Sequence, residues 1–343
     1  MSVVFLVFAA ILLAGWLFDL PRGLVWGLII LLFAAVFSAV VFLPEESGLR
    51  RAIGGTPAGW GTVIGVVVLI GAYIRLLRVI RARVAPQEAV QSGPFSDAEL
   101  GRYARQITLR EIGGPGQLAL KQAKVLVVGA GGLGSPVLQY LAASGVGLIG
   151  VIDDDEVDNS NLARQVIHRD ADIGRPKVFS AEAAMRAQNP SVEVKTYNRR
   201  LSEENAKLLI AEYDLVIDGT DSFDSRYLVN RAAAAEGVPM IGGALSQWEG
   251  MVSVYDPASG APCYQCVFPE APAPGLAPSC AEAGVVSPLP GVVGSMMALE
   301  AIKEVTGAGE GLRGRLLIFD GLSGESRMMK TKRRADCPVC GAG

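Results

Sequence analysis

Three long apolar runs open the chain, ahead of any alternation of strand and helix patterns. Only Asp19 and Arg22 are charged among the first 43 residues, and they separate the first two runs. The third run continues past Arg75. A helix needs about 20 apolar residues, and at least about 17, to cross the hydrocarbon core of a bilayer. The pattern therefore predicts two or three transmembrane helices, over about residues 2–18, 24–43 and 59–80.

The charges around these runs indicate an anchor that is retained. A secretory signal peptide opens with positive charge, whereas the first basic residue here is Arg22. A buried hairpin of soluble-protein helices is the alternative, but uncharged runs of this length are typical of membranes. Basic residues favour the cytoplasmic side, and four of them end the third run: Arg75, Arg78, Arg81 and Arg83. We expect the rest of the chain to face the cytoplasm, although Arg50 and Arg51 in the outer loop do not follow this rule.

A polar linker over residues 84–94 leads to a region, 95–343, in which strand and helix patterns alternate. Such alternation predicts an α/β fold with a Rossmann-like, doubly wound, mostly parallel sheet. The expected strands are 125–128, 148–152, 192–196, 215–217 and 240–241, and the expected helices are 135–144, 177–187 and 224–236. Segments 251–255 and 315–319 are expected to add antiparallel strands around a helix over 294–305.

A glycine-rich turn follows the first of these strands. Gly129, Gly131, Gly132 and Gly134 lie between the strand and the next helix. Without side chains, their backbone N–H groups can approach a phosphate at the helix amino terminus. A turn that merely packs the helix on the strand is the alternative. Ligands of such sheets lie beyond the carboxyl ends of the strands, so the turn predicts a nucleotide at this edge.

The loop after the second strand is acidic at its start and cationic further on. Asp153 lies 19 residues beyond Gly134 and suits the hydroxyls of a ribose, as it would in a dehydrogenase. The polar residues that follow are Asn161, Arg164, Gln165 and Lys177. Their cations suit a reacting triphosphate better than the pyrophosphate of a nicotinamide cofactor. A solvated surface loop is the alternative interpretation.

A third polar loop, after the strand ending at 217, carries Asp221 and Asp224. Carboxylates at a strand end beside phosphates are natural Mg²⁺ ligands. Asp221 is the preferred ligand, because Asp224 is placed to cap the following helix.

Four of the five cysteines form two C-x-x-C pairs, and these are Cys263 with Cys266 and Cys337 with Cys340. Two such pairs can close a tetrahedral zinc site. Two disulfides are the alternative, disfavoured in a reducing cytoplasm. The fifth, Cys280, lies in a Pro- and Gly-rich segment and is either a nucleophile or a bystander. His168 is the only histidine, and we expect it to be packed or on the surface rather than catalytic.

These motifs together resemble the MoeB/ThiF/HesA family, bacterial relatives of ubiquitin-activating enzymes. The motifs that carry the resemblance are R-Y-A-R-Q at 102–106, the glycine turn, S-N-L-A-R-Q at 160–165, D-I-G-R-P-K at 172–177, G-T-D at 219–221, C-A-E-A-G at 280–284 and the two C-x-x-C pairs. They occur in the family's order and cover residues 95–343, closest to the molybdopterin-synthase type. The apolar runs lie outside the resemblance.

The resemblance implies that ATP adenylates the C-terminal glycine of a small ubiquitin-like sulfur carrier that ends in Gly-Gly, for molybdenum cofactor biosynthesis. Asp153 would hold the ribose, Arg164 and Lys177 the phosphates, with support from Asn161 and Gln165, and Asp221 the magnesium. Arg105 resembles an arginine that enters the partner subunit's site, which implies a homodimer. Cys280 matches a cysteine of thiazole-pathway relatives. A bacterial inner membrane is the expected location.

Three alternatives remain open. The same activation could serve thiamine thiazole or another sulfur-transfer pathway. An NAD-dependent oxidoreductase would share the glycine turn but leave the cation cluster idle, and a non-catalytic docking module would have no use for Arg105, Arg164, Lys177 and Asp221. The net charge of −3 gives no indication of nucleic-acid binding.

Overall fold

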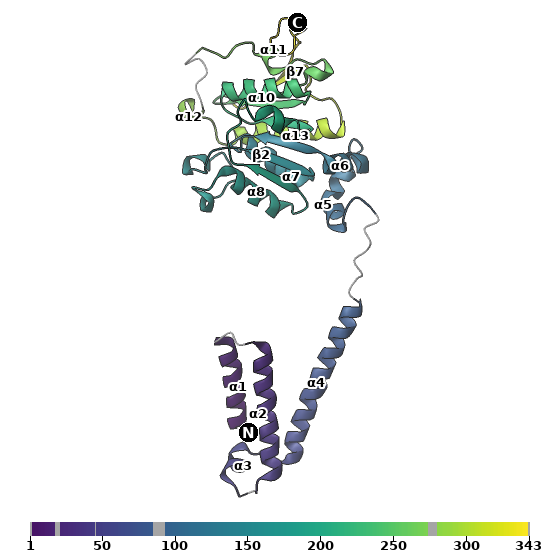
Figure 1. The fold of residues 1–343 in the computed structure, drawn as a ribbon, viewed down its shortest axis with the longest axis vertical. Helices are drawn as coiled ribbons and strands as arrows, with labels where there is room; N and C mark the ends of the chain where they lie inside the picture. Colours follow the sequence, from purple (N-terminus) through teal and green to yellow (C-terminus); the bar gives the residue numbers. More distant parts are fainter. Residues whose placement is uncertain (1, 18–20, 45, 85–92, 274–279, 342–343) are drawn as a thin grey trace. The chain divides into compact units, whose positions relative to one another are not determined.

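The protein is described by a computed structural model that places all residues except 1, 18–20, 45, 85–92, 274–279 and 342–343 (Figure 1). The chain divides into two compact units, Met1–Val90 and Gln91–Gly343. Most of the predicted linker, 84–94, lies outside the described residues, as do the side chains of Arg78, Arg81 and Arg83.

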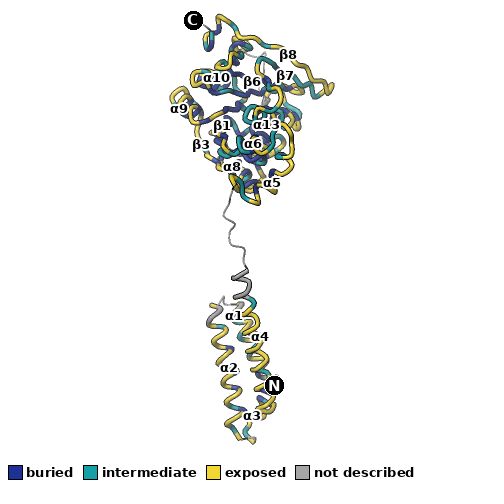
Figure 2. Tube along the Cα trace, turned by 90° about the vertical axis from the view of Figure 1, so that its right-hand side faces the viewer, coloured by how far each residue is buried: buried dark blue, intermediate teal, exposed yellow. Residues whose placement is uncertain are grey.

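The described residues of the first unit form the helices α1 (Ser2–Leu17), α2 (Arg22–Phe42), α3 (Gly48–Ile53) and α4 (Pro57–Val84). Its small core surrounds Trp60, whose indole donates to the carbonyl of Gly54 over 2.8 Å and whose ring meets Phe33 edge to face. Elsewhere the helices expose apolar side chains, including Leu31 and Leu69, and Figure 2 shows this unit as mostly exposed.

Two of these helices are long and apolar enough to cross a bilayer, over Leu24–Phe42 and Pro57–Leu77. This judgement rests on length and composition alone. Helix α1 has 16 residues, slightly fewer than the roughly 17 that a span requires. The third run forms a longer helix than the expected span over about 59–80, since α4 begins at Pro57 and ends at Val84.

An eight-stranded sheet organises the second unit in the order β3-β2-β1-β4-β5-β6-β7-β8. The strands are β1 (Lys124–Val128), β2 (Leu148–Ile152), β3 (Glu193–Tyr197), β4 (Leu215–Asp218), β5 (Met240–Leu245), β6 (Glu249–Tyr255), β7 (Arg315–Asp320) and β8 (Glu325–Lys330). The first five pair in parallel and the last three antiparallel. The predicted α/β class, with its mostly parallel sheet and added antiparallel strands, is confirmed.

Helices cover both faces of this sheet. One face packs against α7 (Gly134–Ser144), α8 (Lys177–Gln188) and α13 (Leu289–Thr306), and the other against α9 (Ala206–Ile210), α10 (Phe223–Glu236) and α11 (Tyr264–Val267). The remaining helices are α5 (Asp97–Ile107), α6 (Gly113–Gln122), α12 (Cys280–Ala283) and the 3-10 turns η1 (Asn159–Asn161), η2 (Asp170–Asp172) and η3 (Pro257–Ser259).

Several boundaries differ from the sequence patterns for physical reasons. Strand β8 was not expected, because every one of its residues is exposed and no apolar alternation marks it. Helix α13 begins at Leu289, five residues before the expected start. Asp224 does not cap α10 as expected, since the Ser222 hydroxyl accepts the N–H of Ser225 at the cap position.

Candidate nucleotide-binding site

The glycine turn brings the backbone of β1 and α7 too close together for side chains. Gly129 has a positive φ of 95°, and a Cβ on Gly134 would lie 1.9 Å from the Gly129 carbonyl oxygen. Among the described residues, the N–H groups of Gly131 and Gly132 donate to no acceptor. Two free donors at a helix amino terminus form a site suited to a phosphate.

Asp153 ties the loop after β2 to this turn. Its Oδ2 accepts the N–H of Ala130 over 2.7 Å, and its Oδ1 accepts the N–H of Asp155 over 2.9 Å. Burial raises the pKa of Asp153, against the lowering effect of Lys177 and of these two bonds. Each oxygen keeps a second lone pair, so the carboxylate can still accept from a ribose hydroxyl.

Arg164 and Gln165 lie against the glycine turn, as the sequence predicted for a common cluster. A Cβ on Gly132 would lie 3.8 Å from Cγ of Arg164, and one on Gly131 would lie 3.8 Å from Nε2 of Gln165. Gln165 is 4% exposed, and its Oε1 has no hydrogen-bond partner among the described groups. A buried carbonyl without a donor is costly, which indicates a polar ligand here.

Arg164 and Asn161 also bond within their own loop. Nη1 of Arg164 donates to the carbonyl of Ser160 over 2.9 Å, and Oδ1 of Asn161 accepts the N–H of Asp158 over 3.2 Å. The loop is thereby shaped locally, and Arg164 as a whole residue is partly exposed.

Lys177 begins α8 and faces the acidic loop. Its Nζ lies 2.7 Å from Oδ2 of Asp155, and its N–H donates to the carbonyl of the same residue over 2.9 Å. The lysine side chain is 7% exposed and that of Asp155 is 67% exposed. The cation is therefore held at the edge of the site by a partner that solvent can reach.

The loop after β4 joins the turn from the other side. The N–H of Gly219 donates to the carbonyl of Val128 over 2.9 Å, and a Cβ on Gly129 would lie 3.1 Å from the Gly219 carbonyl oxygen. Asp221 is exposed two residues further on. The third predicted loop therefore lies beside the first, as expected for neighbouring parallel strands.

The sequence reasoning missed two buried residues beneath this loop. Asp218 is fully buried, its Oδ1 accepts the N–H and hydroxyl of Thr220, and its Oδ2 has no partner among the described groups. Burial raises its pKa, while Arg226 lowers it. Arg226, itself buried, donates to the carbonyl of Thr220 over 2.7 Å. A carboxylate ending an apolar strand was the available signal for Asp218.

Arg105 lies away from the glycine turn of its own subunit. Helix α5, which carries it, lies against the C-terminal ends of α7 and α8, where Arg102 donates to the carbonyl of Gln188 and the Tyr103 ring approaches Gly145. The glycine turn lies at the opposite ends of these helices (Figure 1). Within one chain, the exposed Arg105 is not brought to the site.

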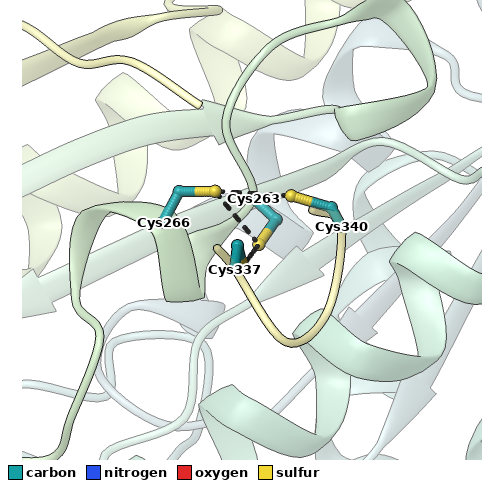
Figure 3. Close-up of side chains that lie close together, drawn as sticks. All are labelled: Cys263, Cys266, Cys337 and Cys340. Carbon is teal, nitrogen blue, oxygen red and sulfur yellow. Dashed lines mark hydrogen bonds between the residues drawn. The ribbon is translucent and has the colours of Figure 1, made fainter. Parts of the chain in front are cut away.

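The four paired cysteines meet in one buried cluster (Figure 3). The Sγ distances are 3.8 Å for Cys263–Cys266, 3.6 Å for Cys263–Cys337 and 3.3 Å for Cys266–Cys340, and all four are free thiols. Four sulfurs bound tetrahedrally at 2.3 Å from zinc would lie about 3.8 Å apart. The donor set fits zinc, and the disulfide alternative is wrong.

Cys280 begins α12, but its side chain lies outside the described part of the structure. Neither its nucleophilic role nor its role as a bystander is tested.

Comparison with known proteins identifies the second unit. The ThiF family model matches residues 103–339. The chain is 50% identical over 251 residues to the sulfur carrier protein adenylyltransferase of Thermus thermophilus, covering 72% of this chain and 93% of the relative. It is 46% identical over 245 residues to the SAMP-activating enzyme E1 of Haloferax volcanii, covering 71% and 90%.

A solved structure shares the fold. The structure of Escherichia coli MccB with MccA-N7isoASN aligns with a TM-score of 0.62 and 22% identity, over 73% of this chain and 76% of that one. At this identity the likeness establishes the fold alone.

Gly134→Ala should destabilise the second unit and weaken nucleotide binding, because the new Cβ would collide with the Gly129 carbonyl. We expect the free energy of unfolding to fall by at least about 2 kcal/mol. Gly291→Ala, in an open position of α13, is the matched control and should be neutral or slightly stabilising. Equal stability of the two variants in denaturant titrations would contradict the assigned close approach.

His168 should titrate below its ordinary pKa of 6.5, because burial lowers it and Lys177 lowers it further, against the raising effects of the Ala130 carbonyl, Asp153 and Asp172. The folded ring then stays neutral where the unfolded ring binds a proton, so His168 weakens folding as pH falls below 6.5 and has no effect above it. The imidazole C–H signal of this single histidine reports the midpoint by NMR. A midpoint at or above 6.5 would contradict the prediction.

Proposed function

The chain belongs to the ThiF family, and on that premise we propose that it adenylates the C-terminal glycine of a small ubiquitin-like sulfur-carrier protein. This activity makes it a nucleotidyltransferase, as the adenylyltransferase names of its relatives indicate. The observation that carries the proposal is the 50% identity over 93% of a sulfur carrier protein adenylyltransferase.

In the proposed reaction a carboxylate oxygen of the carrier attacks the α-phosphorus of ATP, and the bond to the β-phosphate oxygen breaks. The products are an acyl adenylate and pyrophosphate. Two anions must approach each other, so fixed donors and cations at the site lower the barrier. The free N–H groups of Gly131 and Gly132, with Arg164 and Lys177, supply them. Asp153 accepts from the ribose.

Asp221 is the proposed magnesium ligand. It offers one exposed carboxylate beside the turn, which fits an ion that takes one or two carboxylates and completes its shell with phosphate oxygens and water. The ion would neutralise part of the phosphate charge. Asp218, buried behind the loop, holds Thr220 and hence the backbone that carries Asp221.

An oxidoreductase is disfavoured by the position of the cations. Arg164 lies against the turn and Lys177 lies beside the acidic loop that follows β2, whereas a dinucleotide needs only the backbone donors for its pyrophosphate. A docking module would likewise gain nothing from the unpartnered Oε1 of Gln165. Both observations favour ATP as a substrate.

Within the family we propose the molybdopterin-synthase type of carrier. Thiamine thiazole and other sulfur-transfer pathways remain the alternative for the same chemistry. In the thiazole case Cys280 would form a covalent link with the carrier, and in the molybdopterin case it would be a bystander.

We propose a homodimer in which Arg105 enters the partner subunit's site. Helices α8, α7 and α13 form one layer, and each exposes an apolar side chain: Phe179 is 37%, Tyr140 53% and Leu299 57% exposed. We propose that these side chains contribute to the dimer interface. The location of Arg105 away from its own glycine turn supports the same arrangement.

The first unit is proposed to anchor the enzyme in a bacterial plasma membrane, with the catalytic unit facing the cytoplasm. Its exposed apolar helices support this location, as do the arginines that follow the third apolar run.

Carrier-dependent exchange of labelled pyrophosphate into ATP should be catalysed by the full chain in detergent. Asp221→Ala should reduce exchange by about 100-fold, because a preorganised charge partner of the phosphates is lost. Asp224→Ala, on an exposed residue one helical turn away, is the control and should leave exchange unchanged. Absence of exchange with every sulfur carrier of the source organism would contradict the proposed function.

Purified full-length chain should contain about one zinc ion per molecule by elemental analysis, bound by the four thiolates. Cys340→Ser should lose the zinc and lower the thermal midpoint of the second unit. Cys280→Ser is the control and should retain both. Zinc in Cys340→Ser at the wild-type level would show that the cluster is not the binding site.

A further inference from the structure

We propose that His168 is a positioning residue for the nucleotide, because it locks the glycine turn to helix α8 so that the turn's free N–H groups and Lys177 face the phosphates together. The proposal rests on the proposed function only in taking ATP as the nucleotide.

His168 completes a clamp on one peptide of the turn. The N–H of Ala130 donates to Asp153 over 2.7 Å, and the carbonyl of Ala130 lies 2.9 Å from Nε2 of His168. Both polar groups of this residue are thus held by side chains. The next two N–H groups, of Gly131 and Gly132, find no acceptor among the described residues. Fixing Ala130 therefore fixes the direction in which these donors point.

The clamp determines the protonation of the ring. A carbonyl only accepts, so Nε2 must carry a hydrogen. Nδ1 lies 2.9 Å from Oγ of Ser180, and the same Oγ lies 2.9 Å from Oδ2 of Asp172. Ser180 has one hydrogen. It donates this hydrogen either to Nδ1 of a neutral ring or to Asp172, and in the second case a protonated ring donates from Nδ1 to Oγ of Ser180. Either way the bond from Nε2 to Ala130 is kept.

Helix α8 connects the His168 clamp to Lys177. Ser180 is the fourth residue of α8 and Lys177 is the first, so both lie in its first turn. Oδ2 of Asp172, in the segment before α8, lies 2.9 Å from Oγ of Ser180. The glycine turn and Lys177 are consequently linked by one buried path, in which Ser180 is fully buried and His168 is 6% exposed.

The path is polar where packing alone would favour apolar residues. Its neighbours in the core include Ile167, Val178 and Ala181, and apolar groups of similar volume could fill this space without hydrogen bonds. The bonds instead give the turn a single orientation, which is what a phosphate site requires.

The test compares two substitutions of His168 that differ in whether the new side chain keeps a hydrogen-bond donor toward Ala130. His168→Phe removes both bonds, whereas His168→Gln keeps a donor, its Nε2, toward Ala130. The dissociation constant for ATP with Mg²⁺ is measured calorimetrically on the full chain without carrier. We expect an increase of about tenfold for His168→Phe, from one lost hydrogen bond and a stranded carbonyl, and less than about threefold for His168→Gln.

A buried serine elsewhere provides the matched control. Ser253 is 1% exposed and donates to the carbonyl of Arg315 over 2.8 Å, on strand β6 away from the turn. Ser180→Ala should weaken ATP binding severalfold, while Ser253→Ala should lower the thermal midpoint similarly and leave the dissociation constant unchanged. A purely structural role would give the two serine variants the same affinity, which would overturn the proposal.

NMR keeps the proposal testable if His168→Phe does not fold. In ¹⁵N-histidine-labelled wild type the single imidazole should show a slowly exchanging proton on Nε2, and its signals should shift when ATP with Mg²⁺ binds. A hydrogen on Nδ1 alone, or signals unmoved at saturation, would overturn it. Failure of the wild type to bind ATP would instead contradict the proposed function.

Discussion

The close approach of Gly134 to the carbonyl of Gly129 is the constraint on which the rest of the site depends. No side chain fits at this contact, so a short turn can join β1 to α7 with the N–H groups of Gly131 and Gly132 left without acceptors among the described residues. The other two loops at the carboxyl edge, after β2 and after β4, lie around that turn. Asp153 binds it from one side and Gly219 adjoins it from the other. A nucleotide therefore meets a surface fixed before it arrives.

Charge at this edge is balanced before any ligand binds. Lys177 is paired with Asp155, and buried Asp218 is offset by Arg226. Burial raises the pKa of both Asp153 and Asp218. A cation that entered the site with the phosphates would favour the charged form of these carboxylates. Oε1 of Gln165 and Oδ2 of Asp218 are buried hydrogen-bond acceptors without a donor among the described groups. Such groups are tolerated at sites that act on a ligand.

The cysteine cluster and the apolar helices each affect only their own part of the structure. Cys263 immediately precedes α11 and Cys266 lies within it. Tyr264 of this helix packs against Tyr227 and Tyr255 and donates its N–H to Asn230 of α10. The cluster therefore fixes the end of the chain to the helix layer behind the Asp221 loop. Among its described residues, the first unit has a small core around Trp60.

The sequence by itself determined the features that local patterns specify, namely the strands of the parallel sheet, the glycine turn and the two C-x-x-C pairs. These motifs together also indicated the family. It placed Arg164, Gln165 and Asp221 in loops at one edge of the sheet, since strand ends of one sheet edge converge. Only the tertiary structure decided the partners, such as Asp155 for Lys177, Ser180 and Ala130 for His168, and Thr220 for Arg226. It also ruled out Asp224 as a helix cap and revealed β8, whose exposed residues carry no periodic signal. Local patterns fix local conformation, whereas a buried polar group's partner depends on which distant elements pack against it.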